Sequence, residues 1–381
     1  MKPYIKFITS NNVKVFYILT ILLTGIRCSK PQDETVKSLP EINIRYAERF
    51  TIKTNNNEIV ATVKLEAGQE QQYIFHKKDS VQESNATAST IIQVPLEKVV
   101  CLASPHICLI NSLQETDKII GLEDYKSVYN PAILDKVRSG KIYEVGNYDQ
   151  LNLELLVNIH PDAIFESVSS MSGRNAGQLE NLALRTIAIP AHFETHPLGR
   201  LEWIKFFALF FDKQQYADSI FTAIESSYLH TSQLTQSATH KPTVVAGYFS
   251  KGVWVAPGGK SYFAQLLKDA GADYIWKDDS TSGNIKLNYE QLLSKGLGAD
   301  YFINIQMIFK EREQVLNEMP EIRSFKSISN NNFYMNNAMV NAFGKNNYWE
   351  QGFVEPQVIL KDLGRIFHPE LFPDYIPVYF K

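Results

Sequence analysis

Three alternating residues carry the side chains best suited to metal chemistry. They are His192, Glu194 and His196, and alternate side chains of an extended segment point to one face, so the three could hold one metal ion. Pro197 directly after them favours a helix start, which argues against such a site. The chain also has no Gly-x-Ser-x-Gly, His-Glu-x-x-His or Cys-x-x-Cys motif. We therefore predict a protein that is not an enzyme and has no covalent cofactor, with an exported metal-dependent enzyme as the alternative.

A second set of residues, aromatic and polar, is typical of a binding site for a large planar or macrocyclic ligand. Its members follow predicted strands or lie in nearby loops, and in open α/β sheets ligands bind beyond the carboxyl ends of the strands. Tyr248 and Trp254 are the strongest candidates, because they flank a turn. Few lysines or arginines accompany the set, which favours a nearly uncharged ligand over a highly anionic one. The predicted ligand-binding residues are Ser104, His106, Tyr148, Phe193, Tyr248, Trp254, Tyr262, Asn304 and Trp349.

The elements that must position these residues alternate between strands and helices. Short apolar runs at residues 99–103, 162–165 and 186–189 predict buried strands, and segments of helical spacing lie between them. The same order begins again at residue 243. We therefore predict an α/β fold with two Rossmann-like lobes, each with a mostly parallel sheet flanked by helices.

One long helix is predicted between the lobes. Residues 214–236 contain no glycine or proline, and Ala217, Phe221, Ile224 and Tyr228 form an apolar stripe at helical spacing. At 1.5 Å per residue this helix is ~35 Å long, which is enough to bridge two lobes.

Each lobe repeats one short motif. Residues 151–156 are Leu-Asn-Leu-Glu-Leu-Leu and residues 287–293 are Leu-Asn-Tyr-Glu-Gln-Leu-Leu, and in both lobes an aspartate then leads into a predicted strand. The repetition predicts a duplicated architecture. It also places Glu154 and Glu290 at matching helix starts, where a carboxylate complements the helix dipole.

The N-terminal residues predict export. Three lysines precede an apolar run at residues 15–26, which is shorter than the ~20 residues of a membrane span but typical of a secretory signal. Cys28 follows at the boundary with polar sequence and resembles the lipid-attachment cysteine of bacterial lipoproteins, although Arg27 stands where a small residue is usual. Alternation around residues 55–57 predicts a β-hairpin. The predicted parts are a signal peptide (1–27), a lipid-anchor tether with the hairpin (28–90), an N-terminal lobe (91–195), a linking helical segment (196–238) and a C-terminal lobe (239–381).

The composition excludes nucleic acid as a partner. The chain has 381 residues, and its 38 Lys and Arg against 41 Asp and Glu give a formal net charge of −3. Nucleic-acid binding depends instead on clustered basic residues. Three cysteines are too few for a disulfide scaffold.

Several dispersed motifs are similar to those of one family. They are Asn152-Leu-Glu-Leu-Leu with Pro161-Asp-Ala-Ile, the linking helix, and Gly-Gly-Lys-Ser-Tyr at 258–262. Together they resemble the substrate-binding proteins of ABC importers for iron chelates and cobalamin. Residues 196–206, 349–356 and 359–373 resemble the branch found in Bacteroides-like bacteria. The resemblance covers about residues 91–375.

The resemblance implies a periplasmic, membrane-anchored lipoprotein that acts as a monomer. It would capture an iron chelate (siderophore or haem) or cobalamin between the lobes and deliver it to the permease of an ABC importer. In the resembled family one glutamate per lobe contacts the permease, which implies a docking role for Glu154 and Glu290. The stiff linking helix implies a small rocking motion of the lobes. A surface lipoprotein without a permease is a third alternative.

Overall fold

The structure is a computed structural model that describes residues 42–55, 58–78, 90–147, 150–168, 178–305 and 309–381. The predicted signal peptide, the tether with Cys28, and Tyr148 lie outside the described residues. None of the helices in the described ranges is both long and apolar enough to cross a membrane.

The N-terminal lobe has a five-stranded sheet in which every neighbouring pair of strands is parallel. The middle strand, β5, carries the completely apolar run Val-Val-Cys, as expected for a strand covered on both faces. The strands, in spatial order, are β11 (Thr186–Ile189), β10 (Ala163–Ser167), β5 (Val99–Cys101), β6 (Ile119–Leu122) and β7 (Tyr143–Glu144). Its helices are α1 (Ser104–Ser112), α2 (Pro131–Arg138) and α3 (Leu153–Ile159).

The C-terminal lobe repeats this plan and adds two antiparallel strands. β12 pairs in parallel with β14 and β16, and β16 with β17, while β13 pairs antiparallel with β12 and with β15. The strands are β12 (Thr243–Ser250), β13 (Val253–Pro257), β14 (Asp273–Tyr274), β15 (Asn284–Leu287), β16 (Tyr301–Asn304) and β17 (Phe333–Met335). Its helices are α7 (Tyr262–Asp269), α8 (Tyr289–Gly296), α9 (Arg312–Glu318), α10 (Lys326–Ser329) and α11 (Pro356–Phe367).

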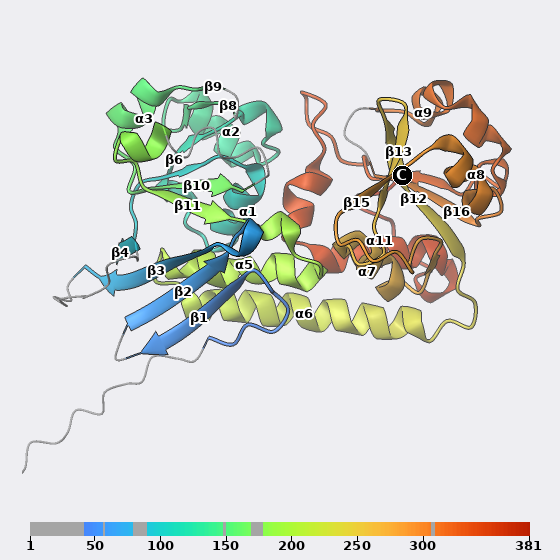
Figure 1. Cartoon of the computed structure of the whole chain (residues 1–381), viewed down its shortest axis with the longest axis horizontal. Helices are drawn as coiled ribbons and strands as arrows, with labels where there is room; N and C mark the ends of the chain where they lie inside the picture. Colours follow the sequence, from blue (N-terminus) through green and yellow to red (C-terminus); the bar gives the residue numbers. More distant parts are fainter. Residues whose placement is uncertain (1–41, 56–57, 79–89, 148–149, 169–177, 306–308) are drawn as a thin grey trace, which may run out of the picture. The chain divides into compact units, whose positions relative to one another are not determined.

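The linking helix has the predicted limits. Helix α6 covers Gln214–Gln236 and buries Ala217, Phe221 and Tyr228 on one side. It packs against α5 (Pro197–Leu209) and against α11 and α7 of the C-terminal lobe (Figure 1). The prediction of two α/β lobes joined by one long helix is confirmed.

The predicted hairpin is one half of a larger sheet. Strands β1 (Phe50–Asn55) and β2 (Glu58–Lys64) form the hairpin, and β3 (Glu70–Lys77) and β4 (Thr90–Val94) complete a four-stranded sheet. Its aromatic side chains pack against α5 and the residue after it, with ring centroids 4.6 Å apart for Phe50–Trp203 and 5.0 Å for Phe75–Phe210. Most of α5 is therefore buried, between this sheet and α6.

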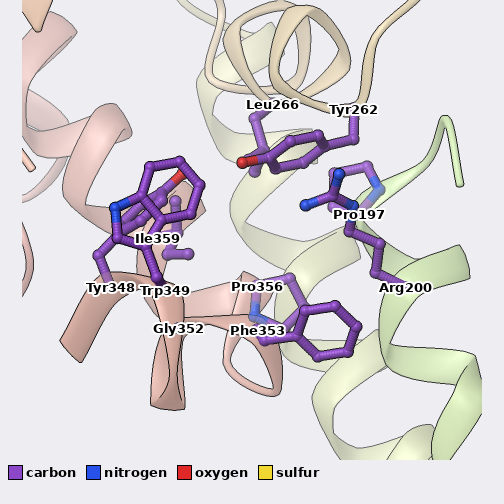
Figure 2. Close-up of a pocket in the computed structure, with 10 residues that line it drawn as sticks. All are labelled: Pro197, Arg200, Tyr262, Leu266, Tyr348, Trp349, Gly352, Phe353, Pro356 and Ile359. Carbon is purple, nitrogen blue, oxygen red and sulfur yellow. The ribbon is translucent and has the colours of Figure 1, made fainter. Parts of the chain in front are cut away.

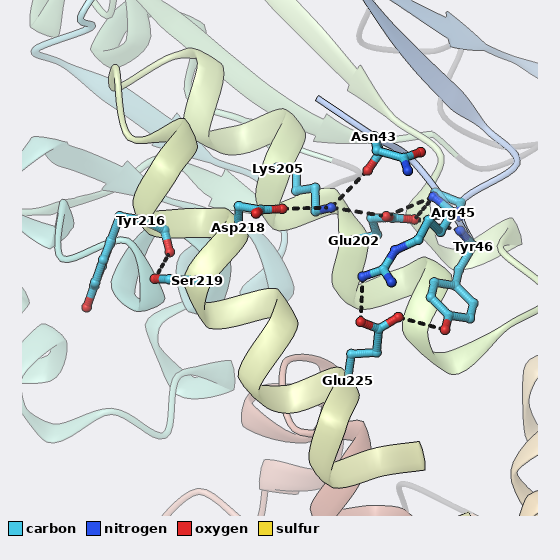
Figure 3. Close-up of polar contacts among 10 residues, drawn as sticks. Asn43, Arg45, Tyr46, Glu202, Lys205, Tyr216, Asp218, Ser219 and Glu225 are labelled. Atoms are coloured by element: carbon cyan, nitrogen blue, oxygen red, sulfur yellow. Dashed lines mark hydrogen bonds and ion pairs between the residues drawn. The ribbon is translucent and has the colours of Figure 1, made fainter. Parts of the chain in front are cut away.

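A short segment before β1, the N-terminal strap (residues 43–49), is held by two buried glutamates. Glu202 accepts the backbone N–H groups of Arg45, Tyr46 and Ala47 at 2.8–3.1 Å. Glu194 accepts those of Glu48 and Arg49 at 2.7 and 3.0 Å. Figure 3 shows the strap lying along α5 and α6. The contact is close, because a Cβ atom at Gly199 of α5 would lie 2.8 Å from the carbonyl oxygen of Tyr46.

Candidate functional site

A pocket of about 40 Å³ lies where the start of α5 meets the C-terminal lobe (Figure 2). Arg200 lines it from α5, Tyr262 from α7, and Trp349 and Phe353 from two short 3-10 helices, Asn347–Trp349 and Gln351–Phe353. Tyr262 and Trp349 were both predicted to bind ligand. The pocket thus joins two predicted residues that are 87 positions apart in the chain.

Residues 340–353, which we name the crossing segment, connect the C-terminal lobe to the N-terminal lobe. The side chain of Asn341 donates hydrogen bonds to the carbonyl oxygens of Lys126 (2.8 Å) and Val128 (3.0 Å). Phe343 packs edge-on against Tyr125, with ring centroids 5.5 Å apart. The lobes are therefore in contact at a second place, apart from α6.

Glu350 is the most buried charged residue of the crossing segment. It is 3% exposed and accepts hydrogen bonds from the backbone N–H of Tyr129 and the thiol of Cys108, both in the N-terminal lobe. Burial raises the pKa of Glu350 to about 7. A protonated Glu350 therefore avoids the cost of a buried charge between the lobes.

Four of the predicted ligand-binding residues share an unusual property. Each has a buried polar atom that has no hydrogen-bond partner among the described residues, and native proteins rarely leave such atoms unpaired unless something else binds them. The atoms are Nδ1 of His106, Nε1 of Trp254, Oδ1 of Asn304 and Nε1 of Trp349.

The remaining surroundings of these four residues differ. His106 is 3% exposed and packs against Phe207, and burial lowers its pKa to about 3, so its ring is neutral. Trp254, which was selected because it flanks a turn, is 1% exposed and packs against Phe302 in the core. Asn304 is also buried, at the end of β16.

Ser104, Phe193, Tyr248 and Tyr262, the other predicted ligand-binding residues that the structure describes, are half-buried. Ser104 begins α1, and Tyr248 lies near the end of β12. Phe193 packs against His192, with ring centroids 4.0 Å apart, and lies below the guanidinium of Arg49.

Two of the three predicted metal ligands, Glu194 and His196, have another role. Glu194 accepts hydrogen bonds from the strap and from Nε1 of Trp203 at 3.0 Å. His196 is the N-cap of α5, where its Nδ1 accepts the backbone N–H of Leu198 at 3.1 Å. Within the described ranges, no group of three or more His, Cys, Asp or Glu side chains could hold a metal ion. The structure therefore does not bring His192, Glu194 and His196 together as a metal site.

Arg200, beside the pocket, was missed by the sequence prediction, and Glu166 lies at a predicted strand end but was not among the predicted ligand-binding residues. Arg200 belongs to a helix rather than to a strand end, so the strand-end rule did not select it. Glu166 is 7% exposed at the end of β10, its Oε1 has no hydrogen-bond partner among the described residues, and burial raises its pKa to about 7. A charged residue within an otherwise apolar strand was the signal that could have found Glu166.

The repeated motif has the same local structure in both lobes. Asn152 and Asn288 are N-caps that accept the backbone N–H groups of Leu155 (3.0 Å) and Gln291 (2.8 Å). Glu154 and Glu290 are exposed in the first turns of α3 and α8. The capping places both carboxylates at the surface in equivalent positions, one in each lobe.

The aspartates that follow are equivalent as well. Asp162 accepts the backbone N–H groups of Glu97 and Lys98 at 2.7 and 2.9 Å, just before β5. Asp300 accepts the backbone N–H of Thr243, the first residue of β12, at 2.9 Å. In the N-terminal lobe the aspartate thus joins the start of β5 to the start of its neighbour β10. In the C-terminal lobe it joins the start of β12 to the start of its neighbour β16.

Sequence comparison finds relatives named as lipoproteins. The chain is 27% identical over 320 residues to an uncharacterised lipoprotein of Methanocaldococcus jannaschii. The aligned region covers 79% of this chain and 73% of the relative. A second uncharacterised lipoprotein of that organism is 25% identical over 406 residues and covers 97% of this chain and 100% of the relative.

Structure comparison finds solved proteins with the same fold. A periplasmic binding protein from Veillonella parvula has a TM-score of 0.60 at 12% identity and covers 84% of this chain and 98% of its own. A possible iron-binding, periplasmic solute-binding protein from Staphylococcus epidermidis has a TM-score of 0.56 at 14% identity. The match covers 72% of this chain and 100% of that protein. The periplasmic haem-binding protein RhuT from Roseiflexus, in apo form, has a TM-score of 0.53 at 13% identity. The match covers 72% of this chain and 99% of that protein.

A family model gives the assignment. The model described as periplasmic binding protein matches residues 99–338, which is more than half of the chain and includes most of both lobes. Its members bind solutes and are not enzymes. The chain therefore belongs to the periplasmic binding protein family.

Proposed function

We propose that this protein binds an iron chelate, haem or cobalamin between its two lobes and delivers it to the permease of an ABC importer. The family match over residues 99–338 is the observation that carries this proposal. The iron-binding and haem-binding proteins of the same fold support the ligand class. The unpaired buried atoms of His106, Asn304 and Trp349 support a ligand at the predicted place.

The proposal also includes a location on the membrane, through a lipid anchor, and a partner, the permease. The relatives named as lipoproteins support a lipid anchor at Cys28, which would hold the protein on the outer side of the cytoplasmic membrane, in the periplasm where there is one. The exposed, equivalently capped Glu154 and Glu290 support docking to a two-fold permease, because charge complementarity at two points fixes the orientation of a complex.

The test is a binding titration of the mature protein with four ligands. Haemin, cyanocobalamin, a ferric hydroxamate and a ferric catecholate are added in turn, and tryptophan fluorescence and the absorption of the chelate are recorded. We expect saturable, reversible binding of at least one ligand, with one ligand per protein and no chemical change. Failure of the folded protein to bind any of the four, or turnover of a bound ligand, would contradict the proposal.

A further inference from the structure

A groove of about 970 Å³ lies between the N-terminal strap and the C-terminal lobe. The strap lines it with Arg45, Tyr46 and Glu48, and the C-terminal lobe lines it with α7, β14 and the residues just before α7 (Figures 1 and 3). We propose that this groove binds a soluble oligophosphate, which is a compact anion with several linked phosphate groups. Its ligand is therefore a second one, in addition to the proposed chelate.

The groove lies at the opposite end of the C-terminal sheet from the strand ends that were predicted to bind the chelate. Asp273 and Tyr274 of β14 line the groove and pair with Thr243 and Val244, the first two residues of β12. The parallel neighbour of β12, β16, ends at Asn304, at the other end of the sheet. Among the residues that the structure describes, no predicted ligand-binding residue lines the groove. The two sites are therefore separate.

The walls of the groove are positively charged. The basic residues that line it are Arg45, Lys241, Lys260, Lys268 and Lys277, and the acidic ones are Glu48 and Asp273. Burial lowers the pKa of His196, which also lines the groove, to about 4, so this ring adds no charge near pH 7. The described walls thus have a formal charge of +3, while the whole chain has −3. A concave surface with one dominant sign of charge concentrates ligands of the opposite sign.

Three of these basic side chains are available to a ligand, because none of them forms an ion pair within the described part of the chain. They are Lys241, Lys260 and Lys268, and all three are exposed. Lys241 donates a hydrogen bond to the neutral side chain of Gln236 at 3.0 Å. The other two basic residues of the groove already pair with carboxylates.

Lys268 has an acidic neighbour in the sequence, but that neighbour is already engaged. Asp269 interacts electrostatically with Lys268. Its two carboxylate oxygens accept hydrogen bonds from the hydroxyl of Tyr228 at 2.6 Å and from the side-chain amide of Gln265 at 2.8 Å. The ammonium group of Lys268 therefore keeps its capacity to donate to a ligand.

The backbone of Lys260 is held on a tight turn at the start of α7. Its N–H donates to the carbonyl oxygen of Thr281 at 3.0 Å, and the next residue, Ser261, is the N-cap of α7. A Cβ atom at Gly259 would lie 2.4 Å from the carbonyl oxygen of Asp279, so this packing requires glycine. Lys260 is thus placed beside a helix start, where the helix dipole also favours an anion.

The spread of the lysines along the groove favours a ligand with several charges. A lysine ammonium is a strongly hydrated point charge, and one exposed ion pair contributes little to binding. An anion with one charged group would pair with one lysine, whereas linked phosphates can pair with three at once. The volume of about 970 Å³ is within the range of small-molecule sites, roughly 300–1,000 Å³. A flat membrane surface, in contrast, cannot enter a concave groove.

Orthophosphate, pyrophosphate and tripolyphosphate are the probes, because they differ in the number of linked phosphates. Each is titrated into the mature protein at constant ionic strength, and the heat of binding is measured by isothermal titration calorimetry. We expect saturable binding of tripolyphosphate, at least tenfold tighter than that of orthophosphate, with pyrophosphate between them. The affinity should fall as sodium chloride is added, because salt screens exposed charges.

The double variant Lys260→Gln/Lys268→Gln should bind tripolyphosphate at least tenfold more weakly than the wild type. The matched control is Lys286→Gln/Lys295→Gln, which changes two exposed lysines of the same lobe that do not line the groove and should bind like the wild type. Far-ultraviolet circular dichroism and the melting temperature establish that each variant is folded. Chelate binding in the four-ligand titration should be the same in both double variants.

Several results would overturn the oligophosphate site. They are orthophosphate binding as tight as that of tripolyphosphate, tighter binding of the tricarboxylate citrate, and unchanged tripolyphosphate binding in the folded Lys260→Gln/Lys268→Gln protein. Binding of phosphatidylglycerol vesicles in place of tripolyphosphate, by a lipid-free Cys28→Ser protein, would assign the groove to a membrane surface instead. If a chelate binds while tripolyphosphate does not, the oligophosphate site is wrong and the proposed function stands.

Discussion

Single buried carboxylates hold much of this structure together. Glu202 is fully buried, accepts three backbone N–H groups of the strap, and lies 3.4 Å from Nζ of Lys205, which itself is 3% exposed. Lys205 also donates to the carbonyl oxygen of Asn43 at 2.9 Å. Both charges are therefore paired, and Lys205 also contacts the exposed carboxylate of Asp218 at 3.1 Å.

Removing Glu202 should unfold the protein more easily. Glu202→Ala leaves the buried strap amides without their acceptor and leaves Lys205 with only its exposed partner Asp218, at 3.1 Å, so we expect a loss of about 3 kcal/mol in the free energy of unfolding. Urea denaturation measures it. Glu318→Ala, at an exposed glutamate of α9, is the control and should change stability by less than about 0.5 kcal/mol. Equal stability of the two variants would show that Glu202 does not hold the strap.

Glu166 should make stability depend on pH. Burial raises its folded-state pKa to about 7, from an ordinary value of 4.5, so the folded state binds the proton more tightly than the unfolded state. Its favourable contribution is complete below pH 4.5 and is lost as the pH rises through 7. Glu166→Gln removes this titration. Between pH 5 and pH 8 the wild type should therefore lose roughly 2 to 3 kcal/mol relative to the variant, measured by urea denaturation at each pH. Parallel pH profiles would contradict a buried, titrating Glu166.

At the scale of elements, the regular spacing of apolar residues determined which helices and strands could be predicted from the sequence. The apolar stripe from Ala217 to Tyr228 is regular, so α6 was predicted with its observed limits. The hairpin had alternating residues and was predicted too, whereas β3 was not. In β3 four consecutive residues, Tyr73 to His76, are buried, so no alternation marks that strand.

The candidate site was harder to predict, because it depends on contacts between distant segments rather than on a local pattern. Strand ends selected His106 and Asn304, each of which has a buried polar atom without a partner among the described residues. Trp254 was selected because a turn lies beside it, and its ring is buried against Phe302. Arg200 lies on a helix and meets Tyr262 only through tertiary packing, which no local pattern contains.

At the scale of the whole chain, the repeated motif should matter for transport. Charge reversal of both Glu154 and Glu290 to Arg should reduce uptake by the cognate importer by about tenfold or more, because repulsion at two contact points opposes docking. Ligand affinity in the isolated protein should not change, since both side chains are exposed. Uptake by cells carrying the variant, compared with a Glu318→Arg control, measures the effect. Normal uptake by the double variant would exclude the docking role.

The lobes should move little when ligand binds. Helix α6 packs against elements on both sides, and the crossing segment adds the contacts of Asn341 and Glu350 with the N-terminal lobe. Packed helices permit small sliding motions more readily than a wide hinge. Small-angle X-ray scattering should give nearly the same radius of gyration with and without ligand. A clear compaction would show that these contacts break on binding.

The strap has a consequence for how this protein can change during evolution. Backbone amides of residues 45–49 make its hydrogen bonds to Glu194 and Glu202, and every residue type except proline has such an amide. Most substitutions in the strap therefore leave these five hydrogen bonds possible, whereas the two glutamates and Gly199 are fixed by geometry. Relatives that keep the strap should be recognised by this Glu-x₄-Gly-x₂-Glu spacing in α5 and the residues before it, rather than by similarity within the strap itself.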